Sequence, residues 1–85
     1  MLYRIYTENT NYTKILELVK SYFPEGFMIL TGEGCSDGKQ EHSLTVDVIT
    51  NDQNRVLDLA YNIKKANKQN SVLVFGCTGE MKIVQ

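Results

Sequence analysis

His42 is the single histidine of the chain, and it lies between Glu41 and Ser43. A histidine titrates near neutral pH and can act as a general base, for which Ser43 or Cys35 would be the nucleophile. Neighbouring residues of a strand point to opposite faces, so this run does not by itself assemble a relay of side chains. The sequence therefore predicts no catalytic residue, and a small hydrolase is the least favoured class of function.

A metal site would need three or four ligands at a recognisable spacing. The candidates are Cys35, Asp37, His42 and Cys77, and they follow no such spacing. Two cysteines without a CxxC motif are typical of free thiols in a reducing compartment. We therefore predict no metal and no cofactor, and whether the two cysteines pair stays open.

Three glycines in the segment 32–41 place flexible backbone amides beside Lys39, as a phosphate cradle requires. The segment does not match GxxxxGK[ST], because only three residues separate Gly34 from Gly38. A loop at the tip of a hairpin also favours glycine, so a purely structural role is the alternative.

Tyr6 follows Arg4 by two residues, so both side chains lie on one face of a predicted strand. An aromatic ring beside a guanidinium can stack on a base or another aromatic ligand. Near the other end of the chain, glycines flank Thr78, where the backbone could approach a ligand or simply turn. The predicted ligand-binding residues are Arg4, Tyr6, Gly34, Lys39, His42 and Thr78.

The length of 85 residues indicates one domain, 1–85, with a single core. Hydrophobic residues make up 42% and charged residues 22%, as in ordinary globular proteins, and the net charge is −1. With this net charge, we expect no positively charged surface that would attract the phosphates of a nucleic acid polymer. Without a signal-like leader or an apolar run of about 20 residues, we expect a cytoplasmic protein that does not contact the membrane.

The hydrophobic spacing alternates between strand and helix periods along the chain. Thr10 or Asn11 is expected to cap the first helix and the pair Asn51-Asp52 the second. The segment 27–30 is a continuous apolar run, predicted to be a strand that is covered on both faces. The expected elements are strand 2–7, helix 11–23 with Tyr12 on its apolar stripe, strand 27–30, loop 32–41, strand 43–50, a second helix ending near 67, strand 71–77, and the tail 80–85 as a candidate edge strand.

Two interlocked, right-handed strand–helix–strand units predict a ferredoxin-like α+β fold, βαββαβ, with a four-stranded antiparallel sheet and two helices on one face. The second and fourth strands are apolar on both sides, and Leu2, Tyr6 and Ile49 add to the face without helices. Large exposed apolar patches are uncommon on monomers, so a homodimer or trimer is expected to cover that face.

The runs YFPEGFMILTGEG, EHSLTVDVIT and NIKKANKQNSVLV resemble a group of short, largely uncharacterised proteins of phages and mobile elements. The element order and the long connection between the second and third strands are also similar to the nitrogen-regulatory PII superfamily. Members of that superfamily form trimers and bind nucleotides or small ligands between subunits. The resemblance implies that the segments 32–41 and 76–79 would border such a site.

The sequence thus favours a non-enzymatic homo-oligomer that binds a small anionic or nucleotide-like ligand between subunits. If the phage resemblance holds, such a protein would sequester a host immune signal. The alternative is an inhibitor module that docks a host protein through the hairpin 32–41 or the sheet face.

Overall fold

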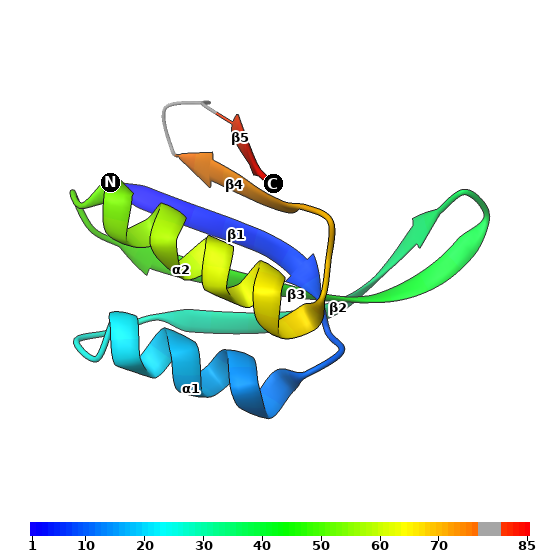
Figure 1. The fold of residues 1–85 in the computed structure, drawn as a ribbon, viewed down its shortest axis with the longest axis horizontal. Helices are drawn as coiled ribbons and strands as arrows, with labels where there is room; N and C mark the ends of the chain where they lie inside the picture. The colour runs from blue at the N-terminus through cyan, green and yellow to red at the C-terminus, as the bar shows by residue number, and fades with distance from the viewer. Residues whose placement is uncertain (77–80) are drawn as a thin grey trace.

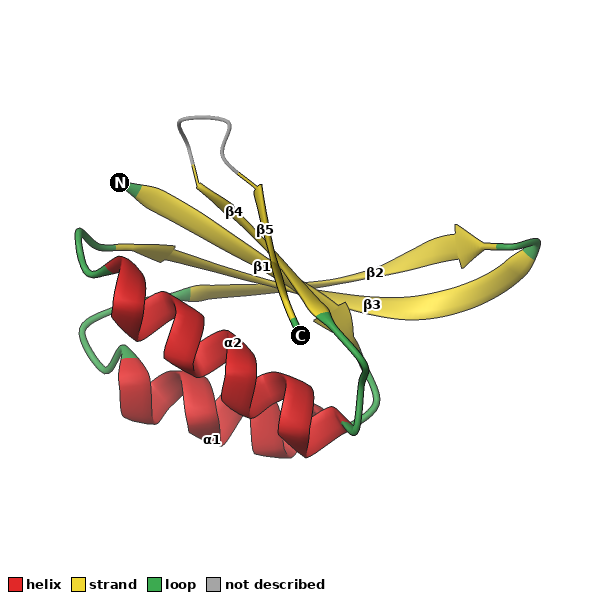
Figure 2. Ribbon diagram, turned by 45° about the horizontal axis from the view of Figure 1, so that its top comes forward, coloured by secondary structure: helices red, strands yellow, loops and turns green. Residues whose placement is uncertain are grey.

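The computed structural model describes residues 1–76 and 81–85 of the chain (Figure 1). Its elements are β1 (Leu2–Glu8), α1 (Tyr12–Tyr22), β2 (Met28–Ser36), β3 (Lys39–Ile49), α2 (Gln53–Asn67), β4 (Val72–Gly76) and β5 (Met81–Val84). The strands form one antiparallel sheet in the order β2-β3-β1-β4-β5, and both helices cover the same face of it (Figure 2). The predicted α+β fold is confirmed, but the sheet has five strands instead of four, because the tail forms β5 beside β4.

The core lies between the sheet and the two helices. In β3 the alternate residues Leu44, Val46 and Val48 are at most 1% exposed, as strict alternation predicts. On α2 the apolar stripe at spacings of three and four is fully buried in the core, which confirms that helix. The core comprises Tyr3, Ile5, Ile15, Val19, Phe23, Leu44, Val46, Val48, Val56, Leu59, Ala60, Ile63, Val72 and Val74.

The two helices begin in different ways. Asp52 caps α2 as predicted, because its Oδ1 accepts a hydrogen bond of 3.1 Å from the Arg55 amide. Asn11 precedes α1, but its side chain makes no capping hydrogen bond, and only its carbonyl accepts from the Ile15 amide, at 3.0 Å. The predicted side-chain cap of α1 is therefore wrong. Tyr12 is also 43% exposed instead of buried, because it lies on the first turn, beyond the edge of the core.

The glycines of the segment 32–41 predicted a loop, and this prediction is wrong. The segment is part of a long hairpin. β2 and β3 pair continuously from Met28 opposite Asp47 to Ser36 opposite Lys39. The turn between them consists of Asp37 and Gly38, with φ of 52° and 76°. Positive φ at both central residues defines a type I′ turn, which matches the twist of the flanking strands.

The end of this hairpin projects beyond the rest of the molecule (Figure 1). We call residues 33–42 the arm, because β1 ends opposite Ser43 and the arm has only β2 and β3. Neither helix lies against it in either ribbon view (Figures 1 and 2). Apart from a hydrogen bond of 3.0 Å from the Asn9 amide to the His42 carbonyl at its base, the order of the arm rests on its own backbone hydrogen bonds and its turn.

Hydrogen bonds between side chains join the two helices. The Tyr22 hydroxyl donates to Asp58 Oδ2 at 2.5 Å and accepts from Asn62 Nδ2 at 2.7 Å. The bond to Asp58 raises the pKa of Tyr22 above its ordinary value of 10.0. Only the neutral phenol can donate this hydrogen bond, so the bond contributes to the stability of the fold at pH values below that ordinary pKa. It is lost as the pH rises through the raised value.

The helix α2 ends in a left-handed residue that is not glycine. Lys68 has φ 55°, and its amide donates to the carbonyls of Lys64 and Lys65. We expect Lys68→Gly to raise the free energy of unfolding by about 0.5–1 kcal/mol, because glycine adopts this conformation without strain. Urea unfolding at one fixed protein concentration measures the change. The exposed neighbour Asn70→Gly is the control, and a Lys68→Gly protein no more stable than this control would contradict the prediction.

Candidate ligand site on the helix-free face

The helix-free face is the side of the sheet opposite α1 and α2, and none of the described elements covers it (Figure 2). It carries two rows of side chains that cross all five strands. One row runs Met28, Asp47, Arg4, Phe75, Met81. The next row runs Leu30, Thr45, Tyr6, Leu73, Ile83.

Seven large apolar side chains on this face are 40–79% exposed. The prediction that strand 27–30 is covered on both faces is therefore wrong for the single chain. The seven residues are Leu2, Tyr6, Met28, Leu30, Ile49, Met81 and Ile83.

A bidentate ion pair occupies the middle of the first row. Arg4 Nε donates to Asp47 Oδ1 and Arg4 Nη2 to Asp47 Oδ2, each at 2.7 Å. The Asp47 side chain is 14% exposed and the Arg4 side chain 39%. The hydrogen bonds to Asp47, and then the nearby Tyr6 hydroxyl, raise the pKa of Arg4 above its ordinary value. The pair therefore fixes a permanently charged, planar donor group on an otherwise apolar surface.

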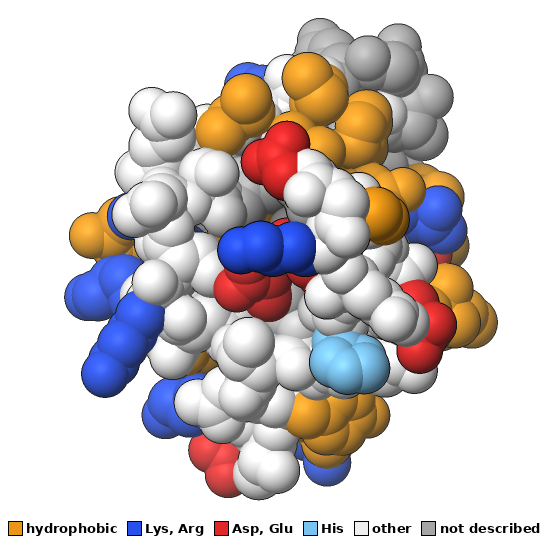
Figure 3. All heavy atoms as spheres, turned by 90° about the vertical axis from the view of Figure 1, so that its right-hand side faces the viewer, with side chains coloured by type: hydrophobic (Ala, Val, Ile, Leu, Met, Phe, Trp, Pro, Cys, Tyr) orange, Lys and Arg blue, Asp and Glu red, His pale blue; other side chains and the backbone are white. Residues whose placement is uncertain are grey.

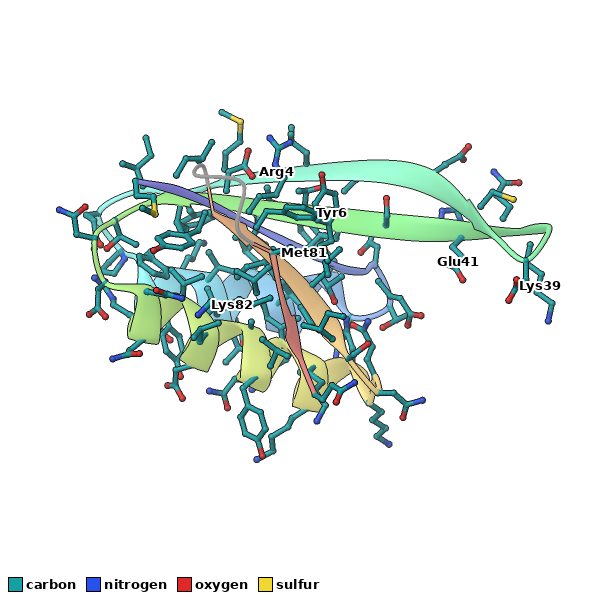
Figure 4. The ribbon with its side chains drawn as sticks, turned by 90° about the horizontal axis from the view of Figure 1, so that it is seen from above. Arg4, Tyr6, Lys39, Glu41, Met81 and Lys82 are labelled. Atoms are coloured by element: carbon teal, nitrogen blue, oxygen red, sulfur yellow. The ribbon has the colours of Figure 1, made fainter. Side chains whose placement is uncertain are left out.

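Two aromatic rings stand beside this guanidinium. Tyr6 and Phe75 pack edge to face, with ring centroids 5.5 Å apart and an interplanar angle of 78°. Together with Arg4, Leu2 and Gly76 they line a hollow of about 250 Å³, which we call the Arg4 hollow. Figure 4 shows Arg4 and Tyr6 next to one another on the sheet. The hollow offers ring faces for stacking and a fixed guanidinium for an anionic group.

A second hollow of about 430 Å³, the Ile49 hollow, lies on the other side of the ion pair. Its two carboxylates already have partners, since Asp47 binds Arg4 and Glu25 lies 3.0 Å from Arg55. The hollow is therefore apolar and close to neutral. Its lining residues are Leu2, Glu25, Gly26, Phe27, Met28, Asp47 and Ile49.

The remaining predicted site residues lie elsewhere. Gly34 and Lys39 are in the arm, and Lys39 is eight residues along β3 from Asp47, about 27 Å at a rise of roughly 3.4 Å per residue. His42, the pale blue side chain of Figure 3, is exposed at the base of the arm. It lines a third hollow together with Glu8, Asn9, Thr10 and Glu41. Thr78 lies outside the described residues. One chain thus brings together Arg4 and Tyr6 and separates them from Lys39 and His42.

Sequence reasoning missed Asp47 and Phe75 as members of the site. The alternation of β3 does place Asp47 on the face of Ile49, away from the core. Its contact with Arg4 depends on the register between strands 43 residues apart, which no local pattern shows.

The described residues contain no cluster of three or more possible metal ligands. Cys35 is exposed near the tip of the arm, while Cys77 lies outside the described part of the chain. Pairing of the two cysteines therefore stays an open prediction. No helix among the described residues has the length and apolar character to cross a membrane.

No protein-family model and no curated protein sequence matches the chain. Solved structures do match over nearly its whole length. A phage SAM lyase in its apo state superposes with a TM-score of 0.72 and 14% identity, covering 99% of this chain and 87% of that one. A second match is CPII, a nitrogen regulatory PII-like protein from Thiomonas intermedia K12 bound to ADP, AMP and bicarbonate. It superposes with a TM-score of 0.62 and 14% identity, covering 99% of this chain and 90% of that one. The chain has a PII-like fold.

The PII-like fold implied by the sequence resemblance is therefore confirmed. The resemblance to short phage proteins fits the match to a phage protein of the same fold, although no family model supports that particular group. At 14% identity these two structures establish the fold, and the function is argued from this chain's own residues.

Proposed function

We propose that the protein is a non-enzymatic homo-oligomer that binds a small, anionic, nucleotide-like ligand in the Arg4 hollow, where one copy meets another. The observation that carries the proposal is the guanidinium of Arg4, fixed by Asp47 beside the rings of Tyr6 and Phe75. This combination is suited to a planar base joined to an acidic group.

The donors of the site support an anionic ligand. Two of the five N–H groups of Arg4 donate to Asp47, which leaves three for other acceptors. The Tyr6 hydroxyl lies near the same guanidinium and is a further donor. A phosphate or carboxylate at this point would meet donors whose positions are already fixed, which reduces the entropy lost on binding.

The size of the Arg4 hollow supports a site between copies. Pockets for small ligands usually measure roughly 300–1,000 Å³ and bury most of the ligand. At about 250 Å³ the Arg4 hollow falls just below this range, and it is open to solvent on the helix-free face. A second copy over that face would deepen the hollow and exclude water from it.

The two neighbours suggest which ligands to test first. CPII is described as bound to ADP and AMP, and the phage enzyme is named for its action on SAM, S-adenosylmethionine. All three compounds contain adenosine, which pairs a flat base with a polar tail. Adenine nucleotides, cyclic adenine nucleotides and SAM are therefore the probes of choice.

We expect at least one of these probes to raise the melting temperature of the native protein. Arg4→Lys should weaken its affinity at least tenfold, because lysine keeps the charge beside Asp47 but lacks the planar fork of donors. Isothermal titration calorimetry measures the affinity, and Lys14→Arg, on the exposed side of α1, is the matched control. Absence of stabilisation by every probe, or unchanged affinity of the Arg4→Lys protein, would contradict the proposal.

Mass spectrometry of the ligand recovered after denaturation separates binding from turnover. A binder that sequesters a signal, such as a cyclic nucleotide, releases it intact. Recovery of cleaved SAM or of a hydrolysed nucleotide would instead assign an enzyme to the same hollow.

The projecting arm favours a second candidate function, the docking of a host protein. Its ten residues lie beyond the rest of the sheet, where a partner could reach both of its faces (Figure 1). Replacing residues 35–39 by a neutral Gly-Ser tip should abolish binding to such a partner in a pull-down, and should leave ligand binding in the Arg4 hollow intact. Retention of the partner by the altered protein would exclude docking through the tip.

A further inference from the structure

We propose that the Ile49 hollow is a second ligand site, which takes a neutral aromatic molecule that carries one hydrogen-bond donor. Indole is a simple molecule of this class. The inference goes beyond the anionic ligand proposed for the Arg4 hollow, because the two hollows differ in position, in charge and in the hydrogen-bonding groups that they offer. The second site can therefore be tested without any ligand in the Arg4 hollow.

The Ile49 hollow forms where β3 extends past the first residue of β2. Met28 begins β2 and pairs with Asp47, whereas Ile49, two residues further along β3, has no partner on β2. The connection between α1 and β2, which includes Glu25 and Phe27, forms the wall there instead. The hollow is thus built by the fold of one chain, at the end of the sheet opposite the arm (Figure 1).

The size and the walls of the hollow suit an aromatic molecule. Its volume of about 430 Å³ lies within the roughly 300–1,000 Å³ of ordinary ligand pockets. Phe27 packs against the core and fixes one wall, while Leu2 and Ile49 are cross-strand neighbours on the helix-free face. Met28 is 58% exposed, and its flexible thioether can adapt to the edge of a ring. A ring in the hollow would remove the apolar surface of these side chains from water.

The charges around the hollow favour a neutral ligand. Asp47 and Glu25 line it, and each carboxylate already binds an arginine. An anion would lie next to two carboxylates, and no basic side chain of the described residues lines the hollow to offset them. A cation would compete with Arg4 and Arg55 for the same carboxylate oxygens. A neutral molecule meets neither of these costs.

The hydrogen-bonding groups of the hollow require a donor on the ligand. An ionised carboxylate has about four lone-pair sites, and Asp47 uses two of them for Arg4. The Asp47 side chain is 14% exposed, so its other sites have little access to water. Among the described residues, no side chain that lines the hollow is a donor at neutral pH. An N–H group on the ligand would therefore bind a charged acceptor for which the hollow itself supplies no donor.

Titration of the native protein with indole, followed by NMR, tests the site. We expect a dissociation constant below about 1 mM and saturable shifts of the methyl signals of Leu2, Met28 and Ile49. Benzofuran has the same shape but a ring oxygen in place of the N–H group, so it should bind at least about fivefold more weakly. Indole-3-carboxylate is anionic at neutral pH and should also bind at least about fivefold more weakly beside the two acids.

Two matched substitutions separate this hollow from the rest of the helix-free face. Ile49 is 79% exposed and Ile83 is 56% exposed, and of the two only Ile49 lines the hollow. Ile49→Ala should weaken the binding of indole at least about threefold, because it removes apolar surface from one wall. Ile83→Ala removes the same atoms from β5, at the other edge of the sheet, and should leave the affinity unchanged. Neither residue packs in the core, so both variants should fold, and their NMR spectra show whether they do.

The outcomes distinguish this site from the Arg4 hollow and from a contact between copies. Absence of a shift at Ile49, or unchanged affinity of the Ile49→Ala protein, would overturn the inference. Shifts confined to Tyr6 and Phe75 would place indole in the Arg4 hollow, which contradicts this inference and leaves the proposed function intact. Benzofuran that binds as tightly as indole would contradict the assigned donor. If a second copy fills the hollow instead, the affinity for indole will rise as the protein is diluted, and the inference is then wrong.

Discussion

Phe23→Ala is expected to lower the free energy of unfolding by about 3–5 kcal/mol, the usual cost of removing a buried aromatic side chain. Phe23 directly follows α1 and has no exposed surface. The guanidinium of Arg55 lies 4.3 Å from the centroid of its ring and also donates to the Tyr22 carbonyl. The substitution therefore leaves a cavity and removes a cation–π contact between the two helices.

Urea unfolding followed by circular dichroism, at one fixed protomer concentration, measures this loss. Tyr12→Ala removes an aromatic side chain from the other end of α1, where it is 43% exposed, and should change stability by no more than about 0.5 kcal/mol. A cost for Phe23→Ala as small as that of Tyr12→Ala would show that the ring does not anchor α1.

Gly38→Val is expected to unfold the arm while the rest of the domain keeps its stability. Gly38 has φ 76° in the turn, and a β-branched residue at such a φ costs at least about 1–2 kcal/mol. No helix packs against the arm, so this cost falls on a segment with few other contacts. Amide hydrogen exchange should show loss of protection in residues 33–42, and thermal unfolding should show a nearly unchanged melting temperature.

Gly34→Val is a matched control in the same arm. Gly34 is extended within β2, and a Cβ there would meet no atom within 4 Å. Valine favours extended strands, so the control should preserve or increase the protection of the arm. Equal loss of protection in the two variants would mean that side-chain bulk, and not the positive φ of the turn, governs the arm.

The sequence predicts well those parts of the fold in which the type of each residue indicates whether its side chain is buried or exposed. Leu44, Val46 and Val48 alternate with polar neighbours, and both the strand and its buried face follow from that pattern. The segment 32–41 gave no such pattern, because Gly32 and Gly34 have no side chain that could show alternation. The Asp37-Gly38 pair was the available signal, since this dipeptide favours the type I′ turn of a hairpin.

The candidate site was predictable only where its members are close in sequence. Arg4 and Tyr6 are two residues apart on one strand, so alternation alone places them on the same face. Asp47 and Phe75 join them through two separate strand pairings, whose registers depend on the packing of the whole sheet. Lys39 and Gly34 were grouped with them as parts of a flexible phosphate-binding loop, whereas the structure pairs both residues in the hairpin, away from Arg4.

The paired arm also limits how its length can change during evolution. Inserting one residue into each of its two strands would preserve their pairing but turn the side chains between the insertions and the tip to the opposite face, because strand residues alternate with a period of two. Inserting two residues into each strand would restore the original facing and move the tip outward by about 7 Å. Variants of this arm should therefore differ in length by even numbers of residues per strand, while the five-stranded body stays constant.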